Sequence, residues 1–117
     1  MEVGIMAGMI ISGIVVCVCT GIVVGIGIAQ MKSQDPVGFY TGEKPPKKEQ
    51  VSNVGSWNKK HGMMWIVYGI CILAAWICSA LIGNNYYALV PFAIGIFVPM
   101  VIMIFYHQKL VKEYLFR

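Results

Sequence analysis

Residues 3–29 form an unbroken run without one charged side chain, which constrains this chain more than any other feature of its sequence. At about 1.5 Å per residue, a helix of this length measures about 40 Å, more than the roughly 30 Å of a bilayer's hydrocarbon core. Two further apolar runs, residues 63–82 and 86–106, each come close to the roughly 20 residues that a membrane helix needs. The composition agrees, because 58% of the 117 residues are hydrophobic and 12% are charged, against roughly a quarter in soluble domains. The sequence therefore predicts three transmembrane helices.

The connections between these runs predict an all-α integral membrane fold. Only Gly83, Asn84 and Asn85 separate the second run from the third, so we expect the last two helices to form an antiparallel hairpin. The first run follows Met1 and Glu2 without a cationic segment and exceeds the roughly 7–15 residues of a signal-peptide core, so we expect a retained helix. The prediction is a single membrane domain, residues 1–117, with a long first helix, the hairpin, a loop over residues 30–62 and a tail over residues 107–117.

The distribution of positive charge predicts the orientation in the membrane. Lysine and arginine near the ends of transmembrane helices stay on the cytoplasmic side. All nine cations lie in the long loop or after the third run: Lys32, Lys44, Lys47, Lys48, Lys59, Lys60, Lys109, Lys112 and Arg117. We therefore expect a protein of the inner (plasma) membrane with the N-terminus outside and the loop and C-terminus in the cytoplasm. The net charge of +4 is modest, and its cations lie where this orientation requires them, so we expect no nucleic-acid partner.

A ridge of small residues runs along the first predicted helix. Its members stand four residues apart, a spacing that lets membrane helices approach closely: Gly13, Cys17, Gly21, Gly25 and Ala29. This ridge has two interpretations. It either joins copies of the chain in a homo-oligomer or packs inside one three-helix protomer, and we favour the second.

Side chains suited to catalysis are absent from the three apolar runs. Ionisable residues inside a membrane helix usually mark proton relays or ion-coupled transport, and none occurs within these runs. His61 and His107 both fall at the predicted cytoplasmic boundary, where they can approach one another, and we expect them to be solvated anchors. The sequence therefore predicts no enzyme activity and no cofactor.

Sulfur side chains offer the one arrangement with metal-binding chemistry. Thiol and thioether ligands favour Cu(I), and such a site has to be built across helices, from Cys17 or Cys19, Cys71, and Met100 or Met103. Buried cysteine is also a good small hydrophobic residue. We therefore expect no metal site and treat the four cysteines as packing residues.

The long loop contains the most distinctive sequence. It opens with a Pro-Val-Gly-Phe-Tyr-Thr element and closes with a Trp-Asn element followed by His-Gly: Pro36, Gly38, Phe39, Tyr40, Thr41, Trp57, Asn58, His61 and Gly62. The prolines and lysines between these elements predict an extended centre that can bind anionic lipid headgroups. Residues 51–57 can fold back as a short interfacial helix.

These two elements resemble a group of short, uncharacterised bacterial three-span membrane proteins, in which a Pro-Val-Gly-Phe-aromatic element precedes an aromatic-Asn-x-x-x-Gly element. The loop is more distantly similar to the immunity-protein family of the sporulation-delaying peptide toxin (SdpI-like). There Gly38, Phe39, Thr41 and Trp57 match a Gly-hydrophobic-Arg-Thr element and a later tryptophan, with Tyr40 at the arginine position. The resemblance implies a bacterial inner-membrane protein.

Two functions remain open from the sequence. The first is a protein that acts by interaction in the lipid bilayer, as a scaffold, an immunity-type factor or a regulator of a larger membrane protein. The second is a homo-oligomeric channel or a transporter of small solutes or metal, since three helices per protomer are too few to enclose a path alone.

Overall fold

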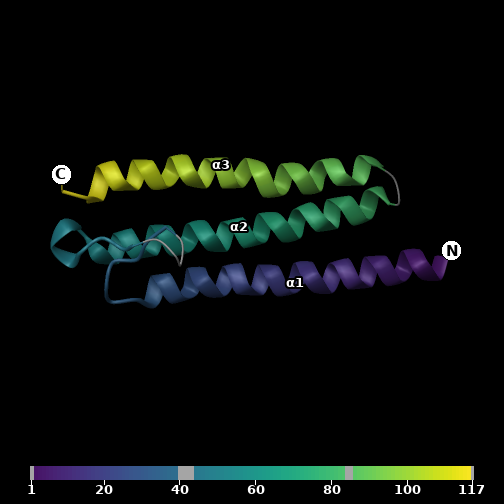
Figure 1. The fold of residues 1–117 in the computed structure, drawn as a ribbon, viewed down its shortest axis with the longest axis horizontal. Helices are drawn as coiled ribbons and strands as arrows, with labels where there is room; N and C mark the ends of the chain where they lie inside the picture. Colours follow the sequence, from purple (N-terminus) through teal and green to yellow (C-terminus); the bar gives the residue numbers. More distant parts are fainter. Residues whose placement is uncertain (1, 40–43, 84–85, 117) are drawn as a thin grey trace.

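The computed structural model describes residues 2–39, 44–83 and 86–116. In this part of the chain three long helices lie side by side: α1 (Glu2–Lys32), α2 (Val54–Ile82) and α3 (Leu89–Tyr114), with short 3-10 helices at η1 (Lys48–Gln50) and η2 (Tyr86–Ala88) (Figure 1). All three are long and apolar enough to cross a membrane. The prediction of an all-helical chain with three such helices is therefore confirmed.

Helix α2 lies between the other two and packs against both (Figure 1). The N-terminus and the connection between α2 and α3 lie at one end of the molecule, and the long loop and the C-terminus lie at the other. Helix α2 ends at Ile82 and is capped by Gly83, whose φ of 96° is in the left-handed region and whose N–H donates to the Ser79 carbonyl. Asn84 and Asn85, the rest of the predicted turn, lie outside the described residues.

Glycines allow α1 and α2 to approach closely near the loop. Gly27 and Gly62 face each other so tightly that a Cβ built on Gly62 would collide with the Gly27 carbonyl and with Met31. About two turns further along α2, away from the loop, the Thr20 hydroxyl donates to the Gly69 carbonyl over 3.5 Å. Backbone thus lies against backbone, as is common where membrane helices pack through small residues.

Small residues also join α2 to α3. A Cβ on Gly95 would overlap Ala75, and the Ser79 hydroxyl donates to the Ala88 carbonyl over 2.6 Å. Pro99 lies inside α3 and has no N–H, so the carbonyl of Gly95 lacks its usual helical donor. The adjacent carbonyl of Ile96 accepts a hydrogen bond from the Tyr68 hydroxyl over 3.1 Å, which ties the interrupted segment of α3 to α2.

The helix ends differ from the predicted ones. Helix α2 starts at Val54 rather than at residue 63, and α3 continues to Tyr114, beyond residue 106. The prediction of a separate interfacial helix over residues 51–57 is wrong, since Val54 onward is the first turn of α2, capped by the Asn53 side chain. The physical reason is that Trp57, Asn58 and His61, at the start of α2, are buried against the loop and α3, so the helix begins before the apolar run does.

Candidate functional site: the loop cap

Asn58, in the second turn of α2, fastens the start of the loop. Its Nδ2 donates to the carbonyls of Ser33 and Asp35 over 3.0 and 2.9 Å, and its Oδ1 accepts from the Val37 N–H over 3.0 Å. The residue is 1% exposed. One amide side chain therefore satisfies three backbone groups of a segment that has no secondary structure of its own.

Three further side chains hold the segment that follows. Trp57 Nε1 donates to the Val37 carbonyl over 2.8 Å, and Trp65 Nε1 donates to the Phe39 carbonyl over 2.8 Å. From α1, Gln30 Nε2 donates to the Gly38 carbonyl over 3.3 Å. The backbone of residues 36–39 is thereby fixed between α1 and α2, and both indole N–H groups find acceptors, as buried tryptophan requires.

The end of the loop is joined to the end of α3. Ser52 N–H donates to the Tyr114 carbonyl and Phe116 N–H donates to the Gln50 carbonyl, so Val51 and Leu115 form an antiparallel bridge. A small apolar core lies beneath it: Val51, Trp57 and Leu110, with Val37, Val54, Tyr106, Val111, Tyr114 and Leu115 around them. We call this assembly the cap: residues 33–39 and 48–53, the first turns of α2 (54–61), and the last turns of α3 with the two residues that follow it (106–116).

Phe39 extends the cap into the space between the helices. Its ring stacks on the His107 ring, with centroids 4.6 Å apart and planes 11° apart, and lies 5.9 Å from the Trp65 ring. It also packs against a buried group formed by Met64, Tyr68 and Met103. The loop thus contributes a side chain to the interior of the helix bundle.

His61 and His107 form the polar centre of the cap. His61 Nε2 lies 2.9 Å from His107 Nδ1, and His61 Nδ1 lies 2.8 Å from the Trp57 carbonyl. The His61 side chain is 0% exposed, which corrects the expectation that it is a solvated anchor. The partners of this imidazole are a ring and a carbonyl rather than a nucleophile or a carboxylate.

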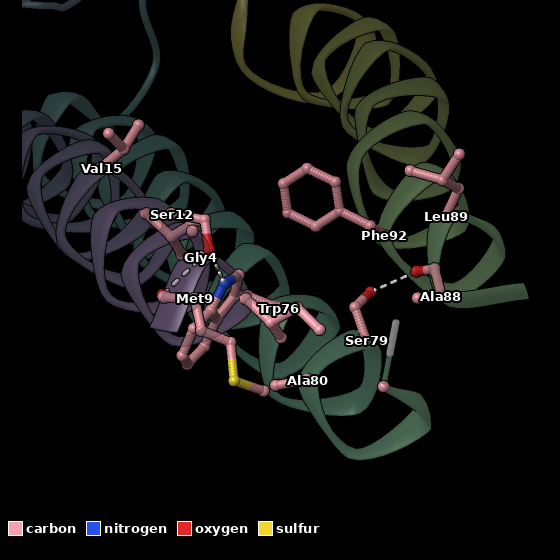
Figure 2. A pocket seen from close by; sticks show the side chains of 14 residues that line it. Gly4, Met9, Ser12, Val15, Trp76, Ser79, Ala80, Ala88, Leu89 and Phe92 are labelled. Carbon is pink, nitrogen blue, oxygen red and sulfur yellow. Dashed lines mark hydrogen bonds between the residues drawn. The ribbon is translucent and has the colours of Figure 1, made fainter. Parts of the chain in front are cut away.

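Away from the cap, the space between α1 and α3 is open. A hollow of about 920 Å³ lies there, bordered by the first half of α1, the last turns of α2 and the start of α3. Figure 2 shows Phe92 of α3 and Ser12 of α1 on its two sides, with Trp76 and Ser79 of α2 between them. The polar side chains on its walls bond to protein: Trp76 Nε1 donates to Ser12 Oγ over 3.1 Å, and Ser79 donates to Ala88.

The structure brings together most of the loop residues that the sequence singled out. They all belong to the cap or its junction with α1: Pro36, Gly38, Phe39, Trp57, Asn58, His61 and Gly62. Tyr40 and Thr41 lie outside the described residues. Gln30 and the pairing of Val51 with Leu115 were missed. The only signal for Gln30 was that it is the first polar side chain after the long apolar run.

The small-residue ridge is placed differently from the arrangement we favoured. Gly13 lies against the Trp76 ring, where a Cβ would come within 3.0 Å, but Cys17, Gly21, Gly25 and Ala29 are exposed. A Cβ on Gly21 or Gly25 would meet no atom within 4 Å. Thr20 and Gly27, which are not members of the ridge, contact α2 instead of these four residues.

The cysteine and methionine side chains that the sequence singled out do not come together in one site across the three helices. Cys71 and Met103 border one cavity between α2 and α3, whereas Cys17 and Cys19 are exposed on α1. Within the described residues, no three His, Cys, Asp or Glu side chains gather in a metal-binding group.

Comparisons with protein-family models, curated proteins and solved structures found no significant match to this chain.

Proposed function

We propose that this chain is a small multi-pass protein of the inner membrane that acts by binding other membrane helices, as a scaffold or regulatory factor, rather than by catalysis. One observation carries the proposal: the side of α1 that bears Cys17, Gly21, Gly25 and Ala29 is open. Membrane helices associate through small residues that admit a second backbone. The open side of α1 offers such a surface to a second copy or to a larger membrane protein.

The chemistry of the polar groups supports an interaction role. Hydroxyls in the helices donate to backbone carbonyls: Ser12 to Met9, Thr20 to Gly69 and Ser79 to Ala88. The loop residues with the most distinctive pattern build the cap, so their hydrogen-bonding groups serve to hold the fold. In this proposal the cap faces the cytoplasm, because the described lysines lie in the loop or next to it and at the end of α3.

The experiment is the detergent-corrected mass of the purified protein, by multi-angle light scattering, for the wild type and Gly21→Leu. We expect a discrete oligomer that Gly21→Leu dissociates, since leucine would separate two backbones in contact at this position. Cys19→Leu is the matched control, because Cys19 is also exposed on α1 but lies outside the ridge. It should leave the mass unchanged.

Two results would contradict the proposal. The first is a strictly monomeric wild type, together with no crosslinked product from Gly21→Cys in native membranes. The second is an oligomer that Gly21→Leu and Cys19→Leu affect equally. Passage of ions or metal across vesicles that contain the protein would replace it with the alternative of a channel or transporter.

A further inference from the structure

A second hollow lies between α2 and α3, in the half of these helices nearest the cap. Its volume is about 370 Å³, and its walls are almost entirely apolar. Helix α2 contributes Lys60 at the cap end, then Val67, and then Cys71 furthest from the cap; α3 contributes Tyr106 and Pro99 over the same stretch. The hollow is therefore elongated along the helices.

Pro99 borders this hollow on the side of α3. Its ring removes one backbone N–H donor and crowds the preceding turn, which interrupts the hydrogen bonding of α3 at this point. Gly95, one turn before it, is in tight contact with Ala75 of α2. The two helices are thus in contact on the side of Pro99 away from the cap, and the hollow lies between Pro99 and the cap.

The side chains around the hollow suit a flexible apolar chain. Three methionines border it, Met63, Met64 and Met103. Methionine has rotatable bonds and a polarizable sulfur, so it adapts to irregular apolar partners. Val67 is 51% exposed along the open side. An acyl chain of a neighbouring lipid can enter here without breaking any hydrogen bond.

The cap end of the hollow carries positive charge. Lys60 lies in its lining, and Lys109 follows Ile102, another lining residue, by two helical turns on the same side of α3. Lys60 Nζ is 3.6 Å from Glu113 Oε1 and lies over the Tyr114 ring. Both side chains of this pair are well exposed, at 39% and 46%, so the pair is weak and leaves Lys60 able to turn toward a stronger anion.

We propose that this groove binds one phospholipid with an anionic headgroup, with an acyl chain between α2 and α3 and the phosphate at Lys60. Charge complementarity selects this occupant over a zwitterionic lipid, since a lysine near the membrane surface favours an anionic headgroup about fivefold. Basic pockets between transmembrane helices on the cytoplasmic side are known to hold such headgroups.

The test uses the purified full chain in a nonionic detergent with equal amounts of phosphatidylglycerol and phosphatidylcholine of identical acyl chains. Native mass spectrometry counts the lipid that each protein molecule retains. We expect each protein molecule to retain one lipid, and retained phosphatidylglycerol to be about five times as abundant as retained phosphatidylcholine. Lys60→Gln should remove this preference. Glu113→Gln breaks the same ion pair but keeps the lysine, so it should preserve or increase the preference.

A second pair of variants tests the groove itself. Val67→Trp fills the hollow from its open side and should abolish the retention of both lipids. Ile70→Trp is the control, because Ile70 is 57% exposed on the same helix but does not line the hollow. Equal retention of the two lipids by the wild type would overturn the proposal, and so would wild-type behaviour of Lys60→Gln or of Val67→Trp.

Discussion

His61 Nε2 lies 2.9 Å from His107 Nδ1, so a hydrogen bond between two imidazole rings ties α2 to α3 within the cap. The Trp57 carbonyl can only accept, so the hydrogen-bond network assigns a proton to His61 Nδ1. In neutral His61 the other nitrogen, Nε2, carries the lone pair. While His61 is neutral, the hydrogen between the rings is therefore donated by His107.

We expect acid to loosen the cap. A proton added to His61 Nε2 requires His107 to release its Nδ1 proton, and burying the resulting charge on His61 is costly. Near pH 6.5, the usual pKa of imidazole, the opened cap takes up a proton that the closed cap excludes. The protection factors of Val37, Gly38 and Phe39, which are exchange rates corrected for the pH dependence of free amides, should therefore fall when the pH is lowered from about one unit above to about one unit below this value. In His107→Leu the bond is absent at every pH, so the acid effect should be smaller. Equal protection factors across this range in the wild type would contradict the expectation.

Asn58→Ala should detach the start of the loop. The substitution removes three hydrogen bonds and leaves the Val37 N–H and two carbonyls without partners, at a cost of about 2–4 kcal/mol in the free energy of unfolding. Asn58→Asp should be at least as damaging, since a carboxylate keeps the acceptor but faces the Ser33 and Asp35 carbonyls. Thermal unfolding in detergent measures the effect, with exposed Lys59→Ala as the control. A change no larger than that of Lys59→Ala would show that the loop is held elsewhere.

The three helices were predictable because long apolar runs have few alternatives to a membrane helix. Their ends at the loop were not predictable from hydropathy. Trp57, Asn58 and His61 lower the hydropathy of the first turns of α2, yet all three are buried by the loop and α3. A hydropathy pattern registers lipid contact but not contact with another part of the protein.

The face on which glycines pack was equally beyond the sequence. Residues four apart advance by about 40° around a helix, so the ridge from Gly13 to Ala29 winds from the contact with α2 to the exposed side. Which turns of α1 contact α2 depends on how the helices are arranged in space, which the ridge itself does not indicate. The approach of His61 to His107 was predictable from their equal depth. The burial of His61 was not, since Trp57 and His107 cover its ring and Phe39 of the loop in turn stacks on His107.

Gly62→Ala should disrupt the contact of α1 with α2. The new Cβ would overlap the Gly27 carbonyl and the Met31 side chain, and forcing the two backbones apart should cost about 1–3 kcal/mol. Gly8→Ala is the matched control, because a Cβ there meets no atom within 4 Å, alanine favours the helix and Gly8 lies outside the ridge. Thermal unfolding of the two variants in one detergent compares them. Equal stability would mean that α1 and α2 are further apart than the structure has them.

Tyr68→Phe should weaken α3 where Pro99 interrupts it. The variant leaves the Ile96 carbonyl without the hydroxyl that bonds it over 3.1 Å, at an expected cost of about 1 kcal/mol. Pro99→Ala restores the N–H that the Gly95 carbonyl lacks and removes the ring that crowds this turn. The Ile96 carbonyl should then bond its own helical donor, the Met100 N–H, and depend less on the Tyr68 hydroxyl. In the Pro99→Ala background Tyr68→Phe should therefore cost much less, and a double-mutant cycle of unfolding free energies gives the difference. Identical costs in the two backgrounds would show that the Tyr68 hydroxyl acts independently of the interruption at Pro99.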